Sequence, residues 1–187
     1  MNIAHIVTLL KSWGWTAYKD EVGDDIASLR CNDSSIRVIP NFKQLGVTEY
    51  AGMMVSLATD EYSYVCSYIR GVETQYFPLI SMWNSLKTRE EKIEDNHIKL
   101  MADQAIMWAK EQSIEEGLAK HAALPTNAPG ARPIYHLASL AILGHVETLK
   151  FYQMSFEKGD RLGFVPYIKK DIIDRAYEAA ISREDSS

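Results

Sequence analysis

The side chains best suited to chemistry in this sequence are its histidines, cysteines and clustered carboxylates. The histidines are His5, His97, His121, His136 and His145, and no two of them stand four residues apart. Zinc sites need several His, Cys or carboxylate ligands at short spacings. The sequence also lacks the zinc-protease, phosphate-loop, dinucleotide, nucleophile-elbow and CxxC motifs. We therefore expect no metal, no cofactor and no catalytic site of a familiar motif class.

The two cysteines, Cys31 and Cys66, both fall in segments that we expect to be strands. A cysteine nucleophile needs a base and an orienting group that the fold brings to it, and the sequence leaves that possibility open. A small apolar residue on a sheet face is the favoured interpretation of Cys66. Because no secretion signal precedes them, we expect two buried thiols rather than a disulfide.

Two groups of carboxylates could bind Mg²⁺ or perform acid–base chemistry. They are Asp20, Glu21, Asp24 and Asp25, and then Asp60 and Glu61. Both groups lie where we expect hairpin turns, and turns are commonly charged and solvated. The favoured interpretation is therefore a solvated turn in each case.

Three tyrosines form a stripe in the segment that follows the second acidic group. Tyr62, Tyr64 and Tyr68 alternate with smaller residues, so on a strand they would project from one face. If helices cover that face, each buried phenol needs a hydrogen-bond partner. If the face stays open, it is a contact surface, because tyrosine is enriched where proteins meet. The sequence favours the covered face only slightly.

The elements that position these residues change type along the chain. Ile3, Ile6, Val7 and Leu10 recur at helical spacing and predict a helix that stops near Gly14. Short segments rich in β-branched and aromatic residues follow, separated by turn signals. We expect strands in the ranges 15–22, 25–32, 35–42, 49–59 and 61–71, with Pro40 at a strand end or edge. Such short connections favour an antiparallel meander of four or five strands.

Beyond Gly71 the sequence predicts only helices. We expect them over 77–86, after a capping pattern at Thr88, after a second one at Ser113, in the segment 132–153 and over 167–180. The fold class is therefore α+β, with an N-terminal helix, a β-meander and a C-terminal helical bundle. We expect a single domain over 1–187 with one shared core, in which 1–72 supply the sheet and 73–187 the helices.

Composition narrows the class of partner. The chain has 187 residues and a net charge of −5, which argues against binding to nucleic acid and favours a basic protein partner. The N-terminus has no basic region or small-residue cleavage site, and no apolar run is long enough to span a membrane. We expect a cytoplasmic protein, and the sequence leaves its oligomeric state open.

The segment "PIYHLASLAILGHVETLKFY", residues 133–152, resembles one ankyrin repeat. The match rests on Pro133, His136, Leu137, Ala138, Gly144, His145, Val146 and Leu149. Tyr135 replaces the leucine of the motif, two extra residues precede Gly144, and the chain has no second copy. Stacked repeats need neighbours, so we expect a lone helix pair closed at Gly144. We expect His136 and His145 to bond backbone groups near its joint.

A compact, acidic, α+β layout without catalytic motifs resembles small bacterial immunity proteins, which neutralise a toxin delivered by a neighbouring cell. This resemblance implies a non-enzymatic protein that occludes a basic toxin domain. The expected contact residues are Asp20, Glu21, Asp24, Asp25, Asp60, Glu61, Tyr62, Tyr64 and Tyr68. Two alternatives stay open: a secretion-type chaperone, and an enzyme with a site built from His136, His145, Asp171 and Asp174.

Overall fold

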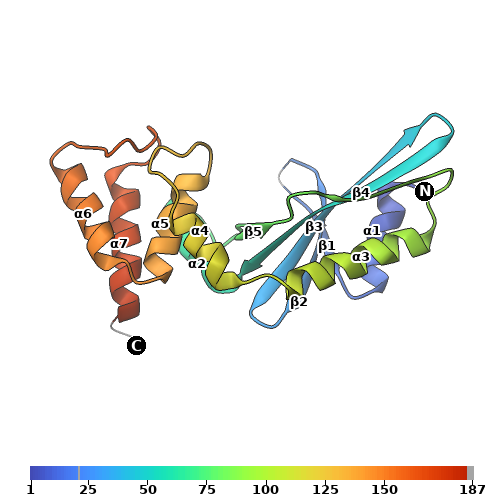
Figure 1. The fold of residues 1–187 in the computed structure, drawn as a ribbon, viewed down its shortest axis with the longest axis horizontal. Helices are drawn as coiled ribbons and strands as arrows, with labels where there is room; N and C mark the ends of the chain where they lie inside the picture. The colour runs from blue at the N-terminus through green and yellow to red at the C-terminus, as the bar shows by residue number, and fades with distance from the viewer. Residues whose placement is uncertain (21, 185–187) are drawn as a thin grey trace. The chain divides into compact units, whose positions relative to one another are not determined.

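The fold is α+β, as the sequence predicts, with helices at both ends of the chain and an antiparallel sheet between them (Figure 1). We analysed a computed structural model, which describes residues 1–20 and 22–184. None of the helices in these ranges is long and apolar enough to cross a membrane. The elements are α1 (Ile3–Ser12), β1 (Thr16–Lys19), β2 (Asp25–Cys31), β3 (Ser34–Leu45), β4 (Thr48–Thr59), α2 (Asp60–Arg70), β5 (Ile80–Ser81), β6 (Leu86–Glu90), α3 (Asp95–Lys110), α4 (Ile114–Ala122), α5 (Arg132–Ile142), α6 (Val146–Glu157) and α7 (Lys170–Glu184).

The chain forms two compact units, each assembled from two stretches of sequence. The sheet unit comprises Met1–Ala58 with Ile80–Gln112, and the helical unit comprises Thr59–Leu79 with Ser113–Ser187. This division differs from the expected one, in which residues 1–72 supply the sheet and residues 73–187 the helices. The segment 59–72 belongs instead with the helices, and the segment 80–112 belongs with the sheet. The single shared core stays a prediction.

The sheet unit is a meander covered by helices on one face. Its strands follow the order β1-β2-β3-β4-β5, and β6 pairs with β4 as well. Helix α1 contacts β1, β2 and β3, and helix α3 contacts α1, β3 and β6. Alternate residues of β4 are buried. These residues are Ala51, Met53, Val55 and Leu57. The first four expected strands and the first helix are confirmed.

Pro40 does not mark a strand end, because β3 continues to Leu45. The backbone pairing of β3 with β2 runs from Ser34 to Val38. Pro40 lies two residues beyond that range, so its missing N–H removes no bond from this pairing.

The expected strand over 61–71 is wrong, because this segment forms α2. The Thr59 side chain accepts a hydrogen bond from the backbone N–H of Tyr62 (3.0 Å) and caps the helix. Asp60 and Glu61 occupy the first turn, where carboxylates interact favourably with the helix dipole. Gly71, with φ of 73°, ends the helix in the left-handed conformation. The acidic pair therefore starts a helix and does not form a hairpin turn.

The expected helix over 77–86 is also wrong. Ile80–Ser81 and Leu86–Glu90 form two short strands along β4, where Leu57 faces Ile80 and Ala51 faces Thr88. Thr88 is thus a strand residue, and α3 begins seven positions later, with Glu94 as its N-cap and His97 completing the capping box. A short apolar run is ambiguous between helix and strand, and pairing with β4 decides the outcome here.

The helical unit is built around α5, which packs against α2, α4, α6 and α7. The helix pair α5–α6 is confirmed, with Pro133 in the first turn of α5 and Gly144 at φ of 72° in the joint. The Ser113 side chain caps α4 by accepting from the N–H of Glu116 (3.1 Å). The last helix begins at Lys170, three residues later than expected.

Candidate functional site

A groove between α2 and α7 of the helical unit brings two of the predicted tyrosines together at the surface. Its volume is about 270 Å³. It is lined by Tyr64, Val65, Tyr68, Ala179, Ser182 and Arg183. Since α2 and α7 contact each other, the groove has one wall from each helix.

Tyr64 and Tyr68 are stacked against each other in this groove. They are four residues apart on α2 and therefore share one helix face, with ring centroids 6.4 Å apart and planes inclined by only 17°. Tyr64 is 58% exposed and Tyr68 is 37% exposed. The hydroxyl of Tyr68 donates to Oε2 of Glu178 on α7 (2.9 Å), and this hydrogen bond to the carboxylate raises the pKa of Tyr68.

Two carboxylates, Glu61 and Glu178, contact residues that line the groove. Glu61 forms an ion pair with Arg183 across the two helices, while Glu178 holds the Tyr68 hydroxyl and Asp60 lies in the first turn of α2. Exposed aromatic faces beside carboxylates attract Arg and Lys side chains through cation–π contacts and ion pairing. The arrangement therefore suits a basic side chain of a partner.

Tyr62 points away from the groove and into the core of the helical unit. It is fully buried, and its hydroxyl lies 2.8 Å from Nδ1 of His121. The ring of His121 in turn stacks on Tyr135, with centroids 5.2 Å apart. On a helix, residues two apart do not share a face. Tyr62 therefore does not lie on one surface with Tyr64 and Tyr68, although the expected strand would have placed all three on the same face.

The first acidic group lies in the sheet unit, at the turn between β1 and β2. The Asp20 carboxylate accepts from the N–H groups of Val22 (3.1 Å) and Asp24 (2.8 Å), and Asp25 pairs with Lys19 (3.0 Å). These contacts close the turn, which agrees with its interpretation as a solvated turn. Glu21 lies outside the described residues. Of the predicted contact residues that the structure describes, three belong to the sheet unit and five to the helical unit, where Tyr62 is buried.

Cys66 is buried in the helical unit beside Tyr62. Burial raises the pKa of the Cys66 thiol to about 12, so at neutral pH the group is almost entirely protonated and unreactive. Cys31, in contrast, lies at the end of β2 and is only partly buried. Both cysteines are free thiols, as expected.

A thiol titration will test this difference. At about pH 8 a chromogenic disulfide reagent should modify Cys31 in the folded protein and leave Cys66 unmodified, whereas in denaturant it should modify both. The variant Cys31→Ser is the control and should show no reactive thiol until it unfolds. Rapid modification of Cys66 in folded Cys31→Ser would contradict the protected position.

The four residues of the alternative enzyme site are dispersed. His136 is buried and lies within hydrogen-bonding distance of the His121 carbonyl (3.3 Å) and the Tyr152 hydroxyl (3.1 Å). His145 is exposed at the joint between α5 and α6. Asp171 pairs with Arg175, and Asp174 pairs with Lys170. Within residues 1–20 and 22–184, no hydrogen bond or ion pair joins any two of the four.

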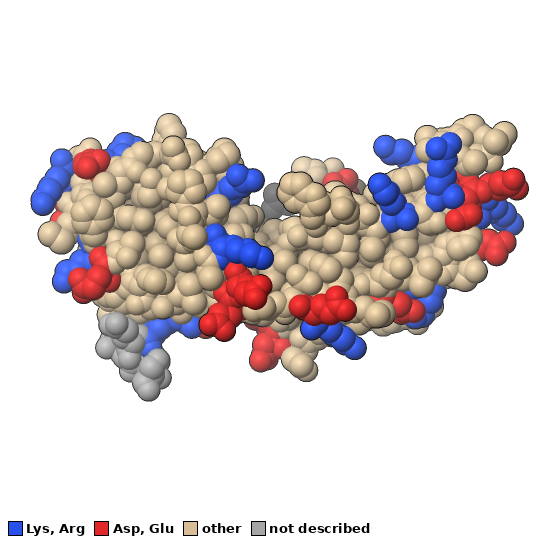
Figure 2. All heavy atoms as spheres, viewed as in Figure 1, with Lys and Arg blue, Asp and Glu red and all other residues tan. Residues whose placement is uncertain are grey.

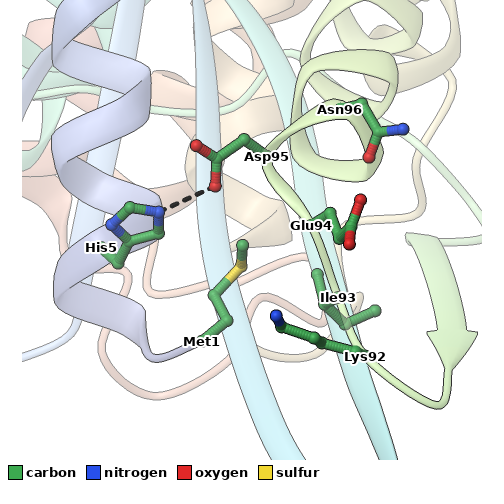
Figure 3. A pocket seen from close by; sticks show the side chains of 7 residues that line it. All are labelled: Met1, His5, Lys92, Ile93, Glu94, Asp95 and Asn96. Carbon is green, nitrogen blue, oxygen red and sulfur yellow. Dashed lines mark hydrogen bonds and ion pairs between the residues drawn. The ribbon is translucent and has the colours of Figure 1, made fainter.

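The sheet unit has an open pocket of about 620 Å³ at the start of α1 and α3 (Figure 3). Two of its side chains, His5 and Asp95, form a pair whose Nε2 and Oδ1 atoms lie 2.8 Å apart. Both side chains are about half exposed, so water screens the pair. No sequence pattern indicates this pair, because its members are 90 residues apart and each lies on an ordinary amphipathic helix.

The fold and the groove define an α+β protein with an exposed aromatic surface. Among the described residues, no group of three or more His, Cys, Asp or Glu side chains could hold a metal ion. The chain belongs to the family DUF6990, a family of unknown function, whose profile matches residues 2–181. No curated protein and no solved structure matches the chain.

Proposed function

We propose that this protein acts by binding another protein, and that the α2–α7 groove receives a basic side chain of that partner. The observation that carries this proposal is the stacked pair Tyr64 and Tyr68, exposed beside Glu61 and Glu178. Exposed, rigid aromatic side chains are the commonest anchors of protein interfaces. A guanidinium group could lie on the tyrosine rings while a carboxylate binds its N–H groups.

The specific function that we propose is that of a cytoplasmic bacterial immunity protein, which neutralises a toxin by covering its active site. The net charge of −5 supports this function, because an acidic surface attracts a toxin domain with basic residues in its active site. The carboxylates that border the groove act in the same direction. Such a protein needs no catalytic residue of its own, since occlusion alone blocks the toxin.

Co-purification with the product of the adjacent gene tests this function. The wild-type chain should form a stable complex with that product, and the double variant Tyr64→Ala/Tyr68→Ala should bind it at least about tenfold more weakly. The matched control is Phe151→Ala/Met154→Ala, which removes two exposed apolar side chains from α6 of the same unit and should leave the affinity unchanged.

Two results would count against the proposal. Failure of the wild-type chain to co-purify with that product or any other protein would remove the immunity function. Equal affinities of the wild type and the tyrosine variant would show that the α2–α7 groove is not the contact surface. Circular dichroism of each variant will establish that it is folded, which the exposure of the substituted side chains leads us to expect.

A further inference from the structure

The face of the sheet opposite α1 and α3 is the second surface of this molecule with a distinct chemistry. Side chains alternate between the two faces along a strand, so the residues between the buried positions of β2, β3, β4 and β6 point to this opposite face. We call it the open sheet face. Its basic members are Arg30, Arg37, Lys43, Lys87 and Arg89.

Contacts between residues of different strands support this common orientation. The guanidinium of Arg37 on β3 lies over the ring of Tyr18 on β1, 5.6 Å from its centroid. On the paired strands β6 and β4, Nε of Arg89 donates to Oγ1 of Thr48 (3.1 Å). In the middle, a Cβ atom added to Gly52 would meet the Asn41 side chain at 2.9 Å, so these two positions also face the same side.

Charge is segregated within the sheet unit. Its two stretches of sequence, 1–58 and 80–112, contain more carboxylates than Lys and Arg residues. Nevertheless, among the described strand residues that point to the open sheet face, five are basic and none is acidic. Figure 2 shows several Lys and Arg side chains gathered at the end of the sheet unit that carries the β3–β4 hairpin, with Asp and Glu side chains beside them.

The same face offers apolar contacts between its cations. Tyr18 is 44% exposed and Met54 is 50% exposed. Trp83, which follows β5 along the edge of β4, is 96% exposed. Aromatic residues, Met and Arg are the residues enriched in protein interfaces, whereas Lys is not. A ligand of this face should therefore combine negative charge with apolar side chains.

We propose that the open sheet face docks a short acidic segment of a partner protein. The cations bind its carboxylates, and Tyr18 and Met54 contact its apolar residues. A protein segment fits better than nucleic acid, because carboxylates flank the cations. Asp33 lies in the β2–β3 turn, and Glu91 directly follows β6. A continuous polyanion would run onto these carboxylates, whereas a short acidic segment ends before them.

This surface belongs to a different unit from the α2–α7 groove and has the opposite charge preference, so the proposal does not depend on the proposed function. The test is fluorescence anisotropy with the full chain and a short fluorescein-labelled peptide of alternating glutamate and leucine. Two further probes are the matching lysine–leucine peptide and an oligothymidylate of equal length. The wild-type chain should bind only the glutamate peptide, and added salt should weaken that binding.

The double variant Lys87→Glu/Arg89→Glu should bind the glutamate peptide about tenfold more weakly, since two attractions become repulsions. The control Lys11→Glu/Lys110→Glu makes the same change in net charge on α1 and α3, which cover the other face, and should retain the wild-type affinity. Circular dichroism will verify that both variants are folded.

Three outcomes would overturn the proposal. The first is that the two double variants bind the glutamate peptide equally well, or that neither they nor the wild-type chain binds it at all. The second is preferential binding of the oligothymidylate, which would make this face a nucleic-acid surface. The third is concentration-dependent dimerisation of the wild-type chain that Lys87→Glu/Arg89→Glu abolishes, because the occupant would then be a second copy of the chain.

Discussion

Truncating Tyr62 to alanine should destabilise the helical unit by about 3–5 kcal/mol, whereas truncating Tyr64, two residues later, should change its stability by less than about 0.5 kcal/mol. Tyr62 is fully buried, and its loss opens a cavity and removes the hydrogen-bonding partner of His121. Tyr64 is 58% exposed, so its truncation leaves the core intact. Urea unfolding followed by circular dichroism will measure both changes.

Binding should show the reverse order, which separates the two roles. Tyr64→Ala should weaken the complex with a basic partner and leave the fold unchanged. The variant Tyr62→Phe keeps the ring but removes the hydroxyl, so it should cost about 1–3 kcal/mol of stability and leave the affinity unchanged. If Tyr62→Ala and Tyr64→Ala had equal effects on stability, the two side chains would share one environment, as they would on one face of a strand.

The sequence contained the signal for this difference, but a second pattern obscured it. Alternation of Tyr62 and Tyr64 with small residues suggested a strand. The buried residues of α2, however, include Tyr62, Val65, Cys66 and Ile69, which recur at intervals of three and four. Thr59 followed by two carboxylates is also a helix-start pattern. The spacing of three and four residues, supported by the capping residue Thr59, was stronger evidence for a helix than the alternation was for a strand.

Local patterns were sufficient for the meander and the α5–α6 pair, where turn signals and periodicity lie within the segment that folds. They were insufficient for β5 and β6. These strands are short and partly exposed, and they exist because β4 offers an edge for pairing. Tertiary pairing of this kind overrides local propensity, so the expected helix over 77–86 was wrong.

The groove was predictable only in part, for a related reason. Glu61, Tyr64 and Tyr68 were among the predicted contact residues, and they do lie together. Their partners on α7, Glu178 and Arg183, are more than 100 residues away in the sequence. Spacing along one helix does not reveal which other helix packs against it, so a groove between α2 and α7 needs the three-dimensional structure.

The buried histidines of the helical unit should make its stability depend on pH. Burial lowers the pKa of both His121 and His136 below the ordinary value of 6.5. For His136, the carbonyl of His121 can only accept, so Nδ1 carries the proton and Nε2 accepts from the Tyr152 hydroxyl. The folded chain thus holds these rings neutral, while the unfolded chain protonates them as pH falls below about 6.5.

Because the unfolded state binds more protons in that range, the free energy of unfolding should be highest above about pH 6.5 and should decrease below it. Urea unfolding at about pH 7.5 and about pH 5.5 will measure the decrease. The variant His136→Gln, which can still donate to one partner and accept from the other, should show a smaller decrease, while the exposed control His145→Gln should match the wild type. If the free energy of unfolding decreased equally in His136→Gln and the wild type, the His136 ring would not contribute to the pH dependence. The dependence would then be assigned to His121, whose ring contacts Tyr62 and Tyr135 in the helical core.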